Sequence, residues 1–125
     1  MKEPIRYLEN ARELLRKSSI EDGYYTDKKY VKSACGVAYL AILEAINEYL
    51  IARGLTKKEL PKKVEEYEKA LKKYASAHNG KLARQFDILY EELHIAGYYR
   101  GLLSDVNVVK EVFKSAKGFI EKIKQ

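Results

Sequence analysis

The chain has 125 residues, a formal net charge of +6 at pH 7 and one cysteine, so it suits a single domain and cannot close an internal disulfide. We expect one domain over residues 1–125, a buried, reduced Cys35 and a cytoplasmic location. The longest uncharged apolar run, residues 36–43, is about half a membrane span, and no secretory signal pattern opens the chain. We therefore expect no membrane association.

The basic residues are mostly lysines, and many alternate with glutamates. Between Lys57 and Lys81 the chain holds eight lysines and four glutamates, a pattern typical of a solvated helix face. A phosphate-binding surface more often combines converging arginines with aromatic residues. The charge pattern thus gives only weak support for nucleic-acid binding and leaves a weakly bound anionic partner open.

The first two predicted helices are separated by a loop. Pro4 opens a helix that runs to about Lys17, with an apolar stripe made of Ile5, Leu8, Ala11, Leu14 and Leu15. Residues 18–26, which include Gly23 and the pair Tyr24-Tyr25, are predicted to form a loop.

The second helix is predicted to begin near the N-cap Asp27 and to end at Gly54. Its apolar residues repeat in steps of three and four, as in a packed bundle helix. They form two adjacent stripes, Val31, Cys35, Ala38, Ile42, Ala45 and Tyr49 in one and Tyr39, Leu43, Ile46 and Leu50 in the other. A helix apolar over so wide an arc should lie at the centre, against several helices or a second subunit.

Three further helices follow the linker 55–60, and no segment alternates like a strand. Their expected ranges are 61–79, closed by Asn79-Gly80; 81–99, closed by Gly101; and a last helix capped by Ser104 or Asp105 that runs to the C-terminus. The expected inward residues are Leu60, Val64, Tyr67, Leu71 and Tyr74, then Leu82, Phe86, Leu89, Leu93 and Ala96, then Val109, Val112, Phe113, Ala116, Phe119, Ile120 and Ile123. The predicted fold is all-α, an antiparallel up-and-down bundle of four long helices plus one shorter helix.

Two blocks of residues carry a resemblance to a known group. The first is Tyr24-Tyr25, Tyr30, Ser33-Ala34, Ala38-Tyr39, Tyr49-Leu50 and Gly54; the second is Leu93-His94 followed by Gly97-Tyr98-Tyr99-Arg100-Gly101. In these blocks the chain resembles HEPN-like helical bundles, and looks most like an uncharacterised bacterial branch related to nucleotidyltransferase substrate-binding (partner) subunits. The resemblance implies a homodimer and a nucleotidyltransferase-type protein partner.

Active members of that group are metal-independent ribonucleases with an arginine followed after four to six residues by a histidine. Here nine residues separate Arg84 from His94, which on an α-helix places them about 15 Å apart and about 80° round the axis. No arginine precedes His78 at a suitable spacing. The reversed order, His94 then Arg100, is about 9 Å and about 120° apart, although Gly97 and Gly101 leave room for a bend. The ribonuclease motif is therefore not found.

The candidate ligand-binding residues are His94, Tyr98, Tyr99, Arg100, Tyr24 and Tyr25, expected to meet at one end of the bundle. His94 suits an acid, a base or a phosphate donor, or alternatively a hydrogen-bonded structural role. The tyrosines suit base stacking or the sealing of the bundle end. Arg100 suits phosphate binding or the capping of helix carbonyls.

No cofactor, metal site or catalytic residue is predicted, because two distant histidines and one cysteine are a poor zinc set and Glu-x-x-His occurs once. The preferred function is a non-enzymatic HEPN-like binding or interaction module for a nucleotide or a nucleotidyltransferase partner. The alternatives are a divergent HEPN-type ribonuclease that uses His94 and Arg100, and a purely structural homodimerising bundle.

Overall fold

In the computed structural model, residues 2–75 and 80–124 are described, and they are mostly helical. The helices are α1 (Lys2–Arg16), α2 (Lys28–Ala52), the 3₁₀ turn η1 (Lys57–Glu59), α3 (Val64–Tyr74), α4 (Lys81–Leu89), the π-helix η3 (Tyr90–Tyr99) and α5 (Val106–Lys124). Two short strands, β1 (Ile20–Glu21) and β2 (Tyr24–Tyr25), separate α1 from α2.

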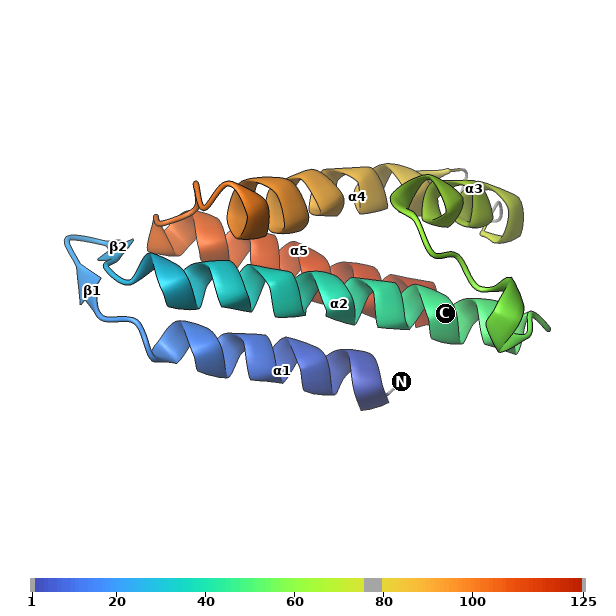
Figure 1. The fold of residues 1–125 in the computed structure, drawn as a ribbon, viewed down its shortest axis with the longest axis horizontal. Helices are drawn as coiled ribbons and strands as arrows, with labels where there is room; N and C mark the ends of the chain where they lie inside the picture. Colours follow the sequence, from blue (N-terminus) through green and yellow to red (C-terminus); the bar gives the residue numbers. More distant parts are fainter. Residues whose placement is uncertain (1, 76–79, 125) are drawn as a thin grey trace.

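Four long helical segments run alternately up and down side by side, and α3 is a shorter addition at one end (Figure 1). These segments are α1, α2, α4 continued by η3, and α5. α2 lies at the centre, because it packs against α1, η3, α5 and α3. The all-α bundle expected from the helical periodicity is confirmed at this level.

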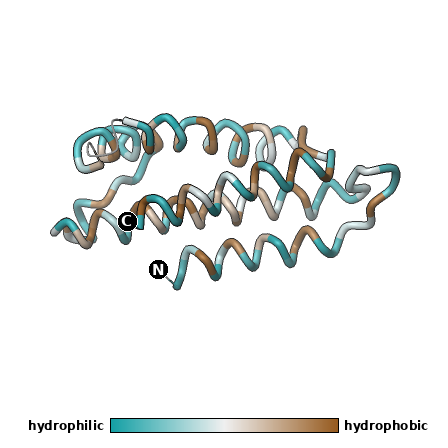
Figure 2. Tube along the Cα trace, turned by 180° about the vertical axis from the view of Figure 1, so that it is seen from behind, coloured by the Kyte–Doolittle hydropathy of each residue, from teal (hydrophilic) through white to brown (hydrophobic). Residues whose placement is uncertain are grey.

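The apolar stripes that define the core are largely those expected from the sequence. On α2 every predicted stripe residue is buried except Leu43, which is half-buried. All seven expected positions on α5 are buried, as are Leu8, Ala11 and Leu15 on α1. Figure 2 shows hydrophobic residues recurring along α1 and α5 between hydrophilic ones.

α2 is also long and apolar enough, by length and composition alone, to cross a membrane. Within the bundle, however, 56% of its most apolar window is buried against protein. Its composition is thus accounted for by its central position among the other helices.

The helix ends that the sequence marked with aspartates are capped as expected. The Asp27 carboxylate accepts a hydrogen bond from the backbone N–H of Lys29 at 3.1 Å. The Asp105 carboxylate accepts from the N–H groups of Asn107 and Val108 at 2.9 and 3.1 Å, so Asp105 caps α5. Both aspartates satisfy backbone donors that have no partner within the helix.

The predicted loop 18–26 instead contains a small β-hairpin, which corrects the expectation of no strand. Ile20 pairs with Tyr25 and Glu21 with Tyr24, around a turn in which Asp22 and Gly23 both have positive φ (52° and 83°). An Asp-Gly pair favours this type of turn, but two residues on each side are too few for an alternating pattern. The hairpin docks on the chain before α5, where the Tyr25 N–H donates to the Ser104 carbonyl at 2.8 Å.

The boundaries of the third helix were also wrong. α3 begins at Val64 rather than Pro61, because the Glu66 carboxylate accepts hydrogen bonds from the N–H groups of Lys62 and Lys63 and so fixes the N-terminus there. The helix ends at Tyr74, before the predicted end at Asn79-Gly80. Asn79 and His78 lie outside the described residues.

The sequence predicted one continuous α-helix over 81–99, but the α-helix ends at Leu89 and the π-helix η3 continues it from Tyr90. The last turn of η3 is closed by a hydrogen bond from the Arg100 N–H to the Ile95 carbonyl (2.8 Å). In a π-helix each residue turns by about 80° instead of 100°, so a residue three positions on lies about 115° away and one four positions on stays within about 35°. The inward position after Leu93 is therefore Gly97, which is buried, and not the predicted Ala96, which is half-buried.

α2 and η3 approach each other closely at two glycines. A Cβ atom added to Gly97 would lie 2.6 Å from the Cys35 Sγ atom, and one added to Gly36 would lie 2.8 Å from Cδ1 of Tyr98. Each glycine thus leaves the space that a side chain of the opposite helix fills.

We predict that Gly97→Ala destabilises the protein by about 1–3 kcal/mol, because the new methyl group overlaps Cys35 in a closely packed contact. Gly118→Ala is the matched control: this helical glycine has no atom within 4 Å of the added Cβ, so the substitution should stabilise by about 0.5–1 kcal/mol. Urea denaturation followed by circular dichroism measures both. Equal effects of the two substitutions would contradict the close contact.

Candidate functional site

Four aromatic rings stack where η3 meets α2, and we call them the aromatic ladder: Tyr90, His94 and Tyr98 on η3, and Tyr39 on α2. The His94 ring centroid lies 4.8 Å from that of Tyr39, 5.5 Å from that of Tyr90 and 5.8 Å from that of Tyr98. The interplanar angles at these three contacts are 30°, 28° and 15°, so the rings are close to parallel. His94 is the central member of the ladder.

The ladder follows from spacing and from the π-helix. Tyr90, His94 and Tyr98 are spaced four residues apart, and residues at this spacing lie on one face of a π-helix. The rise per residue along the axis is smaller in a π-helix than in an α-helix, which brings the successive rings closer together. Gly36 provides room for Tyr98, whose ring lies directly over it. α2 therefore accommodates the last ring of the ladder at Gly36.

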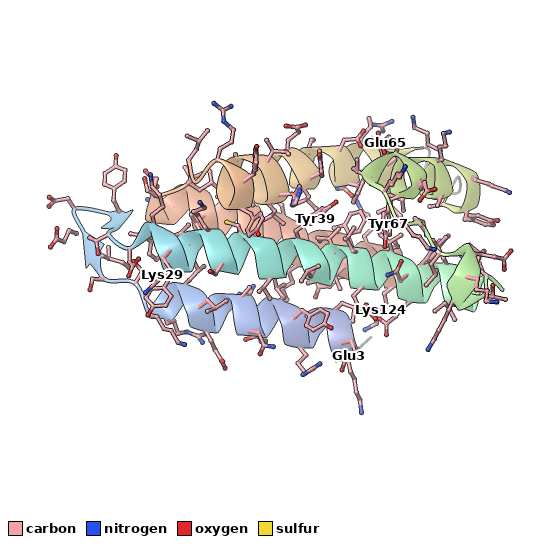
Figure 3. The ribbon with its side chains drawn as sticks, viewed as in Figure 1. Glu3, Lys29, Tyr39, Glu65, Tyr67 and Lys124 are labelled. Atoms are coloured by element: carbon pink, nitrogen blue, oxygen red, sulfur yellow. The ribbon has the colours of Figure 1, made fainter. Side chains whose placement is uncertain are left out.

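On the inner side the ladder continues into the core. Tyr39 is 8% exposed, and its ring centroid lies 6.4 Å from that of Phe86, which in turn lies 6.1 Å from that of Tyr67. Figure 3 shows Tyr39 between α2 and the helix above it, and Tyr67 reaching from α3 toward α2. Burial raises the pKa of the Tyr39 hydroxyl, and the Tyr67 hydroxyl donates to Asn47 Oδ1 at 2.9 Å. These tyrosines thus remain protonated at neutral pH.

Neither Arg84 nor Arg100, the two arginines that the sequence analysis paired with His94, belongs to the aromatic ladder. The Arg84 Nη1 atom lies 3.3 Å from where a Cβ of Gly80 would be, at the start of α4 and away from His94. Arg100 is exposed beyond the end of η3, next to Gly101, which has φ +61°. A Cβ at Gly101 would lie 3.2 Å from the Cδ atoms of Lys28 and Lys32, so this turn adjoins two further cations on α2.

The six predicted site residues come from three segments, and the hairpin lies at the same end of the bundle as the end of η3 (Figure 1). His94 and Tyr98 belong to the aromatic ladder, whereas Tyr99 and Arg100 are exposed at the end of η3. Tyr24 and Tyr25 are on the hairpin, where Tyr24 is 51% exposed and Tyr25 is half-buried. Burial, with a smaller contribution from Cys35, raises the pKa of Tyr25.

Tyr25 lines a groove that sequence reasoning missed, which we call the basic groove. It lies between α1, α5 and the hairpin and has a volume of about 650 Å³. Its basic lining residues are Arg12, Arg16, Lys110, Lys114 and Lys117. The spacing of these residues on each helix was visible in the sequence, but their convergence depends on how distant segments pack.

Comparisons with known proteins place the chain in a family. Residues 1–125 match the family described as "Domain of unknown function (DUF5618)". The chain belongs to the DUF5618 family. A solved structure described as a protein of unknown function from Dyadobacter fermentans is similar to this DUF5618 domain, with 36% sequence identity and a TM-score of 0.79 over 97% of this chain and 90% of that one. No curated protein matches.

The family and this neighbour support the fold but carry no functional description. They do not connect the DUF5618 domain to HEPN-like proteins, so that relationship remains a proposal.

Cys35 is unsuited to nucleophilic chemistry in the DUF5618 domain. Its side chain is fully buried beneath Gly97, and burial raises the pKa of the thiol to about 12. The thiolate, which is the reactive form, is therefore scarce at neutral pH.

Among residues 2–75 and 80–124, no three His, Cys, Asp or Glu side chains gather as ligands for a metal ion.

We predict that Cys35 in the native protein reacts with a thiol reagent such as DTNB at pH 8 at least about 100-fold more slowly than in the urea-unfolded chain. Because the folded pKa of about 12 lies above the ordinary value of 9.0, the thiol's contribution to stability is complete below pH 9 and is lost as the pH rises toward 12. Absorbance at 412 nm follows the reaction. Rapid labelling of the native protein would show that Cys35 is accessible.

Proposed function

We propose that this protein is a non-enzymatic, HEPN-like interaction module that works in the cytoplasm as a homodimer. The observation that carries the proposal is the position of His94 within the aromatic ladder, where tyrosine rings pack against it. A histidine whose ring stacks on tyrosines in this way forms part of one aromatic surface, as a recognition site would use it. The resemblance of the Leu93–Gly101 block to HEPN-like bundles supports the same assignment.

A ribonuclease that used His94 with Arg100 would need both side chains on one phosphate. Gly101 turns the chain next to Lys28 and Lys32, so the backbone of Arg100 lies at the exposed end of η3, beyond the ladder. His94, six residues earlier, faces Tyr39 on α2. This geometry gives no support to a shared phosphate site.

The proposed dimer interface is the outer side of the ladder together with the adjoining row of α2, which we call the aromatic face: Leu40, Leu43, Tyr90, His94 and Tyr98. Leu40 lies one turn beyond Gly36, on which Tyr98 packs, so it flanks the ladder. Leu40 is 52% exposed and Tyr98 is 47% exposed, and none of the five residues is Lys, Arg, Asp or Glu. Exposed apolar surface of this kind marks an interaction site.

A second copy of the chain is the partner that fits this face best. Two copies that each carry +6 repel one another, so they associate most readily through a surface free of lysine and arginine. A two-fold axis would bring the same patch of each copy together, and stacked rings are complementary to themselves. A nucleotidyltransferase-type protein is the partner that the resemblance implies, and its binding to the same face is the alternative outcome.

We predict that the purified protein sediments as a dimer at micromolar concentration and that Leu40→Lys raises the dimer dissociation constant by at least about tenfold, because the substitution buries a charge in the interface. Ile88→Lys is the matched control, since Ile88 is an exposed aliphatic residue (58%) on α4, outside the aromatic face. Sedimentation velocity measures both variants. A monomeric wild-type protein, or equal weakening by both substitutions, would contradict the homodimer.

We also expect no RNA cleavage that depends on His94. Mixed RNA incubated with the wild-type protein in EDTA should remain intact, as it should with His94→Ala and Arg100→Ala. Denaturing gel electrophoresis, with a known ribonuclease as positive control, provides the readout. Cleavage by the wild type that either substitution abolishes would establish the ribonuclease alternative instead.

A further inference from the structure

We propose that the basic groove between α1 and α5 binds a nucleoside polyphosphate, with the phosphates along the two rows of cations and the nucleoside on the apolar floor near the hairpin. The groove lies between helices other than those that carry the aromatic face, so this inference is independent of dimer formation. Its volume of about 650 Å³ falls within the range of small-molecule sites. Figure 2, seen from behind, shows α5 above α1, with the hairpin at the end where α1 finishes and α5 begins.

The charges in the groove are all of one sign. Five of its ten lining residues are Arg or Lys, and none is Asp or Glu. Arg12 also pairs with Glu9 on α1 at 2.7 Å, which compensates part of its charge. Among the residues that the structure describes, Arg16 and the three α5 lysines that line the groove form no ion pair with a carboxylate. The groove therefore attracts anions.

The cations are spread out, which favours a ligand with several charges. Lys110, Lys114 and Lys117 follow one face of α5 over about 10 Å, and Arg12 and Arg16 are about 6 Å apart on α1. One carboxylate or one phosphate would reach only part of these two rows. A polyphosphate chain extends along them, and the planar guanidinium groups of the arginines suit its oxygens.

The rest of the groove suits a flat, mostly apolar body. The floor consists of Leu15, Phe113, Ile20 and Tyr25. Leu15 and Phe113 are buried, whereas Ile20 is 54% exposed and Tyr25 half-buried, so the latter two offer the accessible contact. Ser18 is already engaged, since its hydroxyl accepts from the Asp27 N–H and donates to the Ser19 carbonyl. Tyrosine and isoleucine side chains provide a surface on which a nucleobase packs.

A second groove of similar size provides a comparison within the same molecule. It has a volume of about 540 Å³ and lies between η1 and α3, with Lys58, Lys62 and Lys69 in its lining. Glu59 and Glu66 line it as well, so its charges largely cancel. If lysine density alone attracted polyphosphates, both grooves would bind them. The proposal restricts binding to the groove without carboxylates.

The test is isothermal titration calorimetry of the full chain with ATP, inorganic tripolyphosphate and adenosine, in the absence of magnesium. ATP should bind at least about tenfold more tightly than tripolyphosphate, adenosine should bind weakest, and higher salt should weaken ATP binding. Saturating ATP should also raise the melting temperature by about 5–10 °C. Equal affinities for ATP and tripolyphosphate would overturn the assignment of a nucleoside site.

Variants locate the site. Lys114→Glu should weaken binding of ATP and tripolyphosphate by at least about tenfold, whereas Lys69→Glu, an exposed lysine in the second groove, should change it less than about twofold. Ile20→Ser should reduce the preference for ATP over tripolyphosphate without affecting the folded state, because Ile20 is exposed. Equal weakening by the two lysine substitutions would overturn the proposal. Tighter binding of a single-stranded oligonucleotide than of ATP would also overturn it.

Discussion

The close approach of η3 to α2 is the contact on which the rest of the structure depends. At Gly97 and Gly36 one helix lacks a side chain where the other supplies one, so the two backbones approach each other closely. The same contact places Cys35 inside the protein and Tyr98 outside it. A larger residue at either glycine would separate the helices and disrupt both the core and the stacked rings.

The π-helix adapts this contact to the aromatic residues. In a continuous α-helix Ala96 and Gly97 would lie about 60° and about 40° to either side of Leu93, whereas in the π-helix Ala96 turns about 115° away and Gly97 keeps the position that faces α2. The four-residue spacing keeps Tyr90, His94 and Tyr98 on one side, where Tyr90 and His94 pack against Tyr39 and Tyr98 stacks on His94. π-helical turns are rare and often found at functional sites, and here the π-helix carries three of the five residues of the aromatic face.

The sequence was most informative where a pattern extended over several turns and least informative where three-dimensional packing made the difference. The stripes of α2 and α5 repeat often enough to identify their buried faces, whereas the hairpin around Asp22 has too few residues to show alternation. The spacing of Tyr90, His94 and Tyr98 fits an α-helix as well as a π-helix, so the sequence could not distinguish them. The basic groove was not predictable, because its cations come from helices about 100 residues apart in the chain.

The aromatic face and the basic groove differ in charge. The aromatic face contains no lysine or arginine, while five cations meet across the groove between α1 and α5. α1 packs mainly on α2 and touches α5 only slightly, as expected if like charges on α1 and α5 repel. An anion bound between the cations of α1 and those of α5 would attract both rows and so offset their mutual repulsion. The groove should therefore bind a ligand with several negative charges most tightly. The aromatic face contains no lysine or arginine, so it should bind another uncharged surface most tightly.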